Sequence, residues 1–251
     1  MTEKLQKVLA RNGLGSRREI EAWIVAGRIS INGQLAQLGD RIDDVAKITL
    51  DGKPVSLSTE QASSTQAIVL IYHKPEGEVC TRKDPENRPT VFARLPKLIT
   101  GRWVMVGRLD FNTSGLLLFT NDGELAHKLM HPSFHLTRVY AVRIFGEVNK
   151  QILRNLQQGV QLEDGRAQFD TIESMEQGKT LGKNQWYQVS VSSGRNRIVR
   201  RLWESQGLRV NRLIRLQYGP IHLPKNLQPG SFVQLSAENL KLLIKETKSE
   251  R

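Results

Sequence analysis

The chain has 251 residues, of which 39% are hydrophobic and 25% charged, a composition typical of globular domains with a sizeable core and unlike that of disordered chains. Lysine and arginine number 37 against 25 acidic residues, so the formal net charge is +12. A surplus of this size indicates a polyanionic partner, nucleic acid before an anionic membrane surface. The single cysteine, Cys80, excludes an internal disulfide and a cysteine-based zinc site.

No segment approaches the roughly 18 consecutive apolar residues that a membrane-spanning helix needs. The N-terminal residues alternate charged with apolar side chains, which is not the pattern of a signal peptide. We therefore expect a cytoplasmic protein with no membrane partner, and we expect it to be a monomer.

The first part of the chain has the pattern of two short helices followed by small strands. Apolar residues recur at helical spacing in two groups, Leu5, Val8, Leu9 and Ile20, Trp23, Ile24. Ser16 and Glu19 have the spacing of a capping box at the start of the second helix, which should end at Gly27. Asn32-Gly33 predicts a tight hairpin, and strand-like pieces continue to about Val55.

Residues 56–67 are small and polar without periodicity, which is typical of a linker. We predict one domain over 1–60, a linker over 61–67 and a second domain over 68–251. The alternative is a long surface loop within a single domain.

The second domain mixes strands and helices without a regular alternation. The pattern predicts strands at Ala67–Tyr72, Trp103–Val106, Leu116–Thr120, Arg138–Phe145 and Trp186–Ser192. Helices are expected at Gly123–Met130, Lys150–Gln158, Asn196–Gln206 and Ala237–Glu246. This order favours an α+β fold on a mostly antiparallel mixed sheet over a doubly wound fold.

Basic residues concentrate in two places. The predicted RNA-contacting residues of the first domain are Lys4, Lys7 and Arg11 on one helical face, Arg17 and Arg18 at the start of the next helix, and Arg28. An ordinary amphipathic helix pair is the alternative.

Residues 193–216 hold seven arginines against one acid, Glu204, a net charge of +6 in 24 residues; the arginines are Arg195, Arg197, Arg200, Arg201, Arg209, Arg212 and Arg215. Arginine offers a planar donor fork that suits phosphate and stacks on bases. The apolar residues of the helix expected here form one stripe, which can pack on the sheet. Arg197, Arg200 and Arg201 lie outside that stripe, so their guanidinium groups can contact RNA. A solvated charged face with an Arg200–Glu204 pair is the alternative.

Asp110 is the candidate catalytic residue. It follows a predicted strand and opens the turn-rich segment 107–115, so its carboxylate could act at a basic surface, although aspartate also favours plain turns. His127, His131 and His135 are spaced four apart, but Pro132 interrupts the helix and no acidic or cysteine partner completes a recognisable site, so we expect no metal.

Several segments resemble known families. Residues 3–33 resemble the alpha-L RNA-binding motif. The segment Gly107–Leu118, GRLDFNTSGLLL, resembles the catalytic signature of the RsuA/RluB branch of the pseudouridine synthases. Further matches, in the family's order, are KPEG at 74–77, RVYAV at 138–142, GRNRIVRR at 194–201 and RLIR at 212–215.

The resemblance implies isomerisation of uridine to pseudouridine in folded RNA, with no cofactor. It implies ribosomal RNA as the partner, most closely the 23S RNA of the large subunit. By resemblance, Asp110 acts at the ribose, as nucleophile at C1′ or as base at C2′. Tyr140 stacks on the base and Arg200 pairs with Asp110. Leu213 lies below the base, and Arg108, Arg195, Arg197, Arg201 and Arg215 are expected to bind substrate.

Three other readings stay open. A non-catalytic RNA-binding assembly factor would share both basic surfaces and would not need Asp110. An RNA hydrolase or N-glycosylase would cut the strand or release uracil. The same isomerisation could act on small-subunit ribosomal RNA or on transfer RNA. We expect the first domain to supply affinity and the second to supply chemistry.

Overall fold

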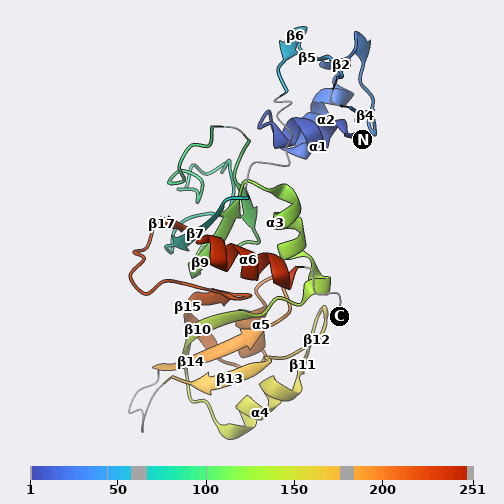
Figure 1. Cartoon of the computed structure of the whole chain (residues 1–251). Helices are drawn as coiled ribbons and strands as arrows, with labels where there is room; N and C mark the ends of the chain where they lie inside the picture. Colours follow the sequence, from blue (N-terminus) through green and yellow to red (C-terminus); the bar gives the residue numbers. More distant parts are fainter. Residues whose placement is uncertain (1, 44, 58–66, 100, 176–183, 248–251) are drawn as a thin grey trace. The chain divides into compact units, whose positions relative to one another are not determined.

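The computed structural model describes residues 2–43, 45–57, 67–99, 101–175 and 184–247 (Figure 1). The chain divides into two compact units. The first comprises residues 1–68 with Pro96–Val104 and Asn121–Gly123, and the second holds the rest. Except for Ala67, the linker predicted over 61–67 lies outside the described residues. Within the described ranges, no helix is both long and apolar enough to cross a membrane.

The first unit combines two helices with short strands. Its elements are β1 (Glu3–Lys4), α1 (Leu5–Arg11), α2 (Arg17–Val25), β2 (Ile29–Ile31), β3 (Gln34–Leu35), β4 (Arg41–Ile42), β5 (Ile48–Leu50) and β6 (Lys53–Val55). The order β3-β2-β5-β6 forms one antiparallel sheet, and β1 pairs with β4.

Local signals in the sequence fix this unit. The Ser16 side chain accepts a hydrogen bond from the Glu19 amide, and the Glu19 carboxylate accepts one from the Ser16 amide, which confirms the capping box. Asn32 (φ 50°) and Gly33 (φ 85°) both adopt positive φ between β2 and β3, as the hairpin prediction requires. The apolar faces of both helices pack with the strands into one core.

The second unit is built on one large sheet. The strands from this point are β7 (Val69–Lys74), β8 (Val104–Val106), β9 (Ser114–Thr120), β10 (Arg138–Phe145), β11 (Val160–Leu162), β12 (Gly165–Ala167), β13 (Thr171–Ser174), β14 (Asn184–Val191), β15 (Arg209–Tyr218), β16 (Ile221–His222) and β17 (Phe232–Gln234). The helices are α3 (Gly123–Met130), the 3₁₀ turn η1 (Pro132–Phe134), α4 (Lys150–Gln158), α5 (Ile198–Glu204) and α6 (Ala237–Glu246).

The sheet runs in the order β13-β14-β10-β15-β9-β7-β17, with β8 beside β9 and β16 beside β15. The β15–β9 pairing is parallel, whereas β13–β14, β14–β10, β10–β15, β15–β16, β9–β7 and β7–β17 are antiparallel, which agrees with the α+β prediction of a mostly antiparallel mixed sheet. At that junction a Cβ on Gly115 would lie 2.3 Å from the carbonyl oxygen of Arg215. Glycine is therefore required where the two strands meet.

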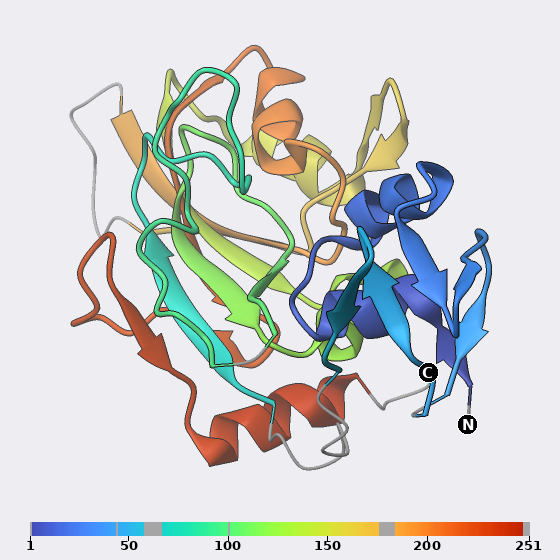
Figure 2. The ribbon, with the colours of Figure 1, turned by 90° about the horizontal axis from the view of Figure 1, so that it is seen from above.

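Helices cover both faces of this sheet. Figures 1 and 2 show α5 and α6 on opposite faces. On the α5 side, Trp203 is fully buried and its ring packs against those of Phe169 and Tyr187, at centroid distances of 5.9 and 5.3 Å. This packing anchors α5, and it fixes the loop that precedes the helix.

The structure also corrects the sequence-based elements. The helix expected over Asn196–Gln206 is shorter, because Arg197 adopts a left-handed conformation (φ 48°) and α5 begins only at Ile198. The long central strand β15 was not predicted. It has irregularities in its ladder with β10, so its side chains do not alternate simply along its length.

Candidate active site

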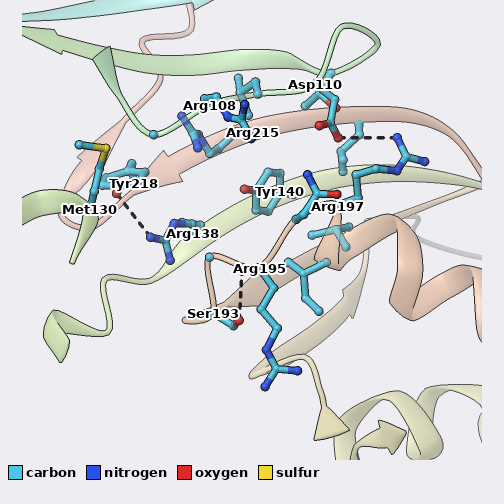
Figure 3. A pocket seen from close by; sticks show the side chains of 18 of the residues that line it. Arg108, Asp110, Met130, Arg138, Tyr140, Ser193, Arg195, Arg197, Arg215 and Tyr218 are labelled. Atoms are coloured by element: carbon cyan, nitrogen blue, oxygen red, sulfur yellow. Dashed lines mark hydrogen bonds and ion pairs between the residues drawn. The ribbon is translucent and has the colours of Figure 1, made fainter. Parts of the chain in front are cut away.

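A cavity of about 450 Å³ opens on the second unit (Figure 3). Its walls come from strands β10 and β15 and from the loops that precede β9 and α5. Seven of the nine residues predicted to act on or bind substrate line it, namely Arg108, Asp110, Tyr140, Arg195, Arg197, Leu213 and Arg215. The two that do not line it are Arg200 and Arg201.

Asp110 lies in the loop between β8 and β9. Its carbonyl oxygen accepts a hydrogen bond from the Thr113 amide (3.0 Å), which closes a turn over residues 110–113. Its side chain is 33% exposed and lines the cavity. The carboxylate is therefore held on a short turn and is open to a substrate.

A buried lysine fastens this turn from below. Lys74 is fully buried at the end of β7, and its ammonium donates to the carbonyl oxygens of Thr113 (2.8 Å), Pro75 (2.9 Å) and Phe111 (3.4 Å). Burial lowers the pKa of Lys74. Its hydrogen bonds hold the main chain of the turn, and Lys74 is not among the residues that line the cavity, so it positions the turn and does not contact a substrate there.

Arg200 holds the same turn, which corrects two expectations. The sequence predicted that Arg200 would be solvent-exposed and paired with Asp110, but it is 4% exposed. Its guanidinium donates from Nη1 to the Val210 carbonyl (2.9 Å) and from Nη2 to the Asn112 carbonyl (2.8 Å). Burial lowers the pKa of Arg200, and the neighbouring charge of Arg197 adds to this effect. Main-chain carbonyls, rather than a carboxylate, are its hydrogen-bond partners.

The ion pair of Asp110 is instead made by Arg197, whose Nη1 lies 3.8 Å from Asp110 Oδ2 (Figure 3). Arg197 occupies the N-cap of α5 in the left-handed conformation. It also lies 3.6 Å from the Glu204 carboxylate. The Arg197 side chain is 39% exposed, so this guanidinium lies at the rim of the cavity where a substrate can meet it.

Tyr140, Leu213 and Arg215 form the cavity floor. In the β10–β15 ladder Tyr140 lies opposite Arg215, and Val142 lies opposite Leu213, so these side chains share one face of the sheet. Tyr140 and Leu213 are 8% and 4% exposed. Together they offer a flat aromatic ring and an aliphatic surface, which suit the two faces of a nucleobase.

Arg215 is buried beside this floor. Its Nε donates to the Leu116 carbonyl (2.7 Å), and its guanidinium carbon lies 5.1 Å from the ring centroid of Tyr218. Arg138 approaches the same ring at 5.0 Å and lines the cavity. Neither Arg138 nor Tyr218 was predicted from the sequence as a site residue, because tertiary packing brings them to the cavity.

Two arginines that were predicted to bind substrate also contact a hairpin. The turn between β11 and β12 presents Asp164, whose carboxylate accepts hydrogen bonds from both terminal nitrogens of Arg201. Arg195 donates to the Gly165 carbonyl (3.2 Å) and lies 3.7 Å from Asp164. Arg201 lowers the pKa of Asp164. In contrast, Arg108 is exposed at the cavity edge.

The basic residues of the first unit are also partly paired. Lys4 belongs to β1 rather than to α1, so the predicted helical face of three cations holds only Lys7 and Arg11. Both of these pair with Glu3, at 2.9 and 2.6 Å.

The other predicted cations of this unit differ in their exposure to a ligand. Arg28 makes a bidentate pair with Asp51. Arg17 and Arg18 are exposed in the first turn of α2, where main-chain amides also point outward. They are the cations of this unit best placed for phosphate.

The cavity thus combines one carboxylate with an aromatic and aliphatic floor and a cationic rim. Across the described part of the chain, no cluster of three or more histidine, cysteine, aspartate or glutamate side chains has the arrangement of a metal site. A carboxylate beside a base-sized apolar floor can attack or deprotonate a sugar while the base is held by stacking.

Comparisons with known proteins agree with these features. The family described as RNA pseudouridylate synthase matches residues 68–205, and the S4 domain family matches residues 3–44. A protein of Pseudomonas aeruginosa named ribosomal large subunit pseudouridine synthase B is 54% identical over 244 residues. The alignment covers 97% of this chain and 62% of that protein, so the chain spans less than two thirds of that relative.

A protein of the same name from Escherichia coli is 58% identical over 237 residues, covering 94% of this chain and 80% of that protein. A crystal structure titled pseudouridylate synthase superposes with a TM-score of 0.64 at 22% identity, covering 96% of this chain and 99% of that one, which shows the shared fold. From the match over 68–205 and these identities, the chain belongs to the RNA pseudouridylate synthase family and carries an S4 domain at residues 3–44.

Proposed function

We propose that this protein isomerises a uridine to pseudouridine in the ribosomal RNA of the large subunit. The observation that carries the proposal is the Asp110 carboxylate, held on a fastened turn in a cavity that has a base-sized floor and a cationic rim. The names of the relatives support the choice of substrate, since each refers to the large ribosomal subunit.

In the proposed reaction Asp110 acts at the ribose, either by attacking C1′ or by removing the C2′ proton. The bond between N1 and C1′ breaks, the uracil turns within the cavity, and C5 bonds to C1′. The proton of C5 then leaves and N1 gains one, so the product is an isomer and no redox partner is consumed. We assign to Tyr140 the stacking of the base and a part in the final deprotonation.

A uridine in an RNA helix must leave its stack to reach this cavity, at a cost of a few kcal/mol. Stacking of a base on an aromatic ring is worth about 1–3 kcal/mol, so contact with Tyr140 offsets much of that cost. The support for this role is the position of Tyr140 beside Leu213 on the cavity floor.

RNA affinity, in this proposal, comes from cations outside the reaction centre. Arg17 and Arg18 of the S4 domain and Arg108 and Arg195 near the cavity would contact phosphates, because they are exposed on their respective units. Arg197 would serve both roles, since it touches Asp110 and remains accessible. Phosphate contacts of this kind make binding depend steeply on salt.

Pseudouridine-specific carbodiimide treatment followed by primer extension tests the proposal. Ribosomal RNA from cells lacking this protein is compared with RNA from cells complemented by the wild type or by Asp110→Asn. One stop in large-subunit RNA that the wild type restores and the variant does not would support the proposal. An unchanged pattern of stops in large-subunit RNA would contradict the proposal. A changed stop in small-subunit or transfer RNA would show that this RNA is the substrate instead. No change in any of these RNAs would favour a non-catalytic assembly factor.

We further infer a cytoplasmic monomer. The bacterial relatives named for the ribosomal large subunit support the compartment. The monomer stays a prediction, and light scattering coupled to size-exclusion chromatography measures it.

A further inference from the structure

An exposed aromatic ring lies directly beside the candidate catalytic carboxylate. Phe111 follows Asp110 in the chain and is 47% exposed, although it is a large apolar side chain. It does not line the cavity that holds Asp110. Consecutive Cα atoms are about 3.8 Å apart, so the ring starts one residue away from the group proposed to act on the ribose. A ligand that places its sugar at Asp110 therefore brings its neighbouring parts to Phe111.

The main chain of Phe111 is fixed, so the ring has a defined starting point. The Phe111 carbonyl accepts a hydrogen bond from the Gly77 amide (2.9 Å) and one from the buried Lys74 ammonium (3.4 Å). The turn closed between Asp110 and Thr113 contains Phe111. A ring exposed on such a fastened turn loses little conformational freedom when a ligand stacks on it.

Arg88 supports the ring. Its guanidinium carbon lies 5.8 Å from the ring centroid of Phe111. The guanidinium is itself held by two hydrogen bonds to Asp84, at 3.0 and 2.8 Å, and by an ion pair with Glu86 at 3.0 Å. Because two carboxylates already neutralise Arg88, it is poorly suited to bind phosphate and well suited to act as a rigid planar support.

The loop that carries Arg88 is tied to the core of the second unit. The ring of Phe92 packs edge-on against the buried Phe119, with centroids 5.3 Å apart. The Val79 amide donates to the Pro89 carbonyl (2.9 Å), and the Val91 amide donates to the Val79 carbonyl (3.1 Å). Phe111 and Arg88 thus form a small platform whose two parts are anchored independently.

We infer that this platform stacks the nucleobase adjacent to the target uridine. The inference rests on the proposed function, since it needs RNA whose ribose lies at Asp110. A base fits the site better than a phosphate does, because the exposed group is an apolar ring and the nearby cation is already paired. Stacking tolerates any base, so the platform would position the strand beside the target rather than read its sequence.

The platform is tested by substitutions at Phe111, with Kd measured for an RNA fragment that contains the target uridine. Phe111→Leu keeps an apolar side chain and removes the ring, and we expect Kd to rise about 5- to 100-fold. Phe111→Trp should bind within about twofold of the wild type. The matched control is Phe145→Leu, which removes an equally exposed ring (46%) from the end of β10. It should leave Kd unchanged.

Two further RNAs distinguish loss of stacking from misfolding of the variant. One has an abasic nucleotide on the 5′ side of the target, and the other has it on the 3′ side. On the wild type, one of these two substitutions should raise Kd as much as Phe111→Leu does. On that RNA, Phe111→Leu should have no further effect, since the stacking partner is already gone. Equal Kd for the wild type and Phe111→Leu would overturn the inference. It would also be overturned if Phe111→Leu raised Kd by its full factor on both abasic RNAs.

Rate measurements separate this inference from the proposed function. Pseudouridine formation by the wild type is measured on the same RNA that is used for Kd. If the wild type forms no pseudouridine in this RNA, the proposed function fails. If the wild type does so and Phe111→Leu matches it in Kd, only the platform fails.

Discussion

The guanidinium of Arg200 donates a 2.8 Å hydrogen bond to the carbonyl oxygen of Asn112, two residues beyond Asp110. Residues 88 positions apart in the chain are thereby joined under the cavity. Lys74 donates hydrogen bonds to the carbonyls of Phe111 and Thr113, on either side of Asn112. Three successive main-chain carbonyls therefore accept hydrogen bonds from buried cations. The turn that bears the carboxylate is therefore positioned by its main chain, and its side chain stays open to substrate.

Replacing Arg200 should destabilise the fold. Arg200→Met removes the donors of two main-chain carbonyls, those of Asn112 and Val210. The Val210 contact is buried and the Asn112 contact is partly exposed. A buried acceptor left without a partner costs about 1–3 kcal/mol and a partly exposed one costs less, so we expect a loss of about 1–4 kcal/mol in the free energy of unfolding. Urea denaturation measures it. The control is Arg201→Met, which breaks a partly exposed ion pair that solvent screens, so its effect on stability should be small. Equal losses for the two variants would contradict this role of Arg200.

Replacing Arg197 should slow the reaction without unfolding the protein. The Arg197–Asp110 pair has side chains 39% and 33% exposed, so solvent screening leaves it worth no more than about 1 kcal/mol of stability. Because its guanidinium lies 3.8 Å from the carboxylate that we propose to react, Arg197→Gln should lower the single-turnover rate about 10- to 100-fold. Arg197→Lys should recover part of that loss. An unchanged rate in Arg197→Gln, with RNA at saturation, would show that the pair is incidental.

Removing the hairpin carboxylate should strengthen RNA binding. Asp164→Asn releases Arg201, and it releases Arg195 from its longer contact. Each additional phosphate contact steepens the dependence of log Kd on log salt by about 0.7–0.9. We expect a tighter Kd and a steeper slope in a salt titration. Glu163→Gln changes the net charge equally at the neighbouring turn residue and is the control. Identical slopes for both variants would mean that Arg201 does not reach RNA.

Acid should weaken the loop that supports Phe111. Hydrogen bonds from Arg88 hold the pKa of Asp84 down at about 2, below the ordinary carboxyl value of 3.8. Because the folded pKa lies below the unfolded one, this stabilisation is complete above about pH 4 and is lost as the pH falls towards about 2. The unfolding free energy of the wild type should fall more steeply across that window than that of Asp84→Asn or Arg88→Gln. If the unfolding free energy of all three proteins fell equally with pH, the Asp84–Arg88 pair would not be the cause of the acid sensitivity.

Much of the fold could be predicted from local signals. The helices at Gly123–Met130, Lys150–Gln158 and Ala237–Glu246 and the strand Arg138–Phe145 have the predicted bounds. The capping box at Ser16 acts within four residues, so no tertiary contact was needed to predict it.

Strand β15 could not be predicted in the same way. Its ladder with β10 skips a residue at two places, so its buried residues Val210, Leu213, Arg215 and Tyr218 are spaced by three, two and three positions. That spacing is closer to a helix than to the alternation of a strand. The buried Arg215 also replaces an apolar residue on the buried face, which weakens the apolar pattern further.

Seven of the nine residues predicted for the site line the cavity, but the arginine that pairs with Asp110 was not the one predicted. The sequence places Arg197 and Arg200 in one short segment. Their different roles follow from the left-handed conformation of Arg197 and from carbonyls that a distant loop brings to Arg200. Neither feature has a local signal in the sequence. The support of Phe111 by Arg88 likewise depends on a loop 23 residues away in the chain.

Release of tritium from RNA labelled at C5 of uridine tests the central claim most directly, because the C5 proton leaves only when C5 bonds to the ribose. The RNA is a large-subunit fragment, and Kd is measured in parallel for the wild type and Asp110→Asn. We predict one tritium released per target by the wild type. We predict at least about a thousandfold slower release by Asp110→Asn, with RNA affinity retained. Release by Asp110→Asn at the wild-type rate would contradict the assignment of the chemistry to this carboxylate.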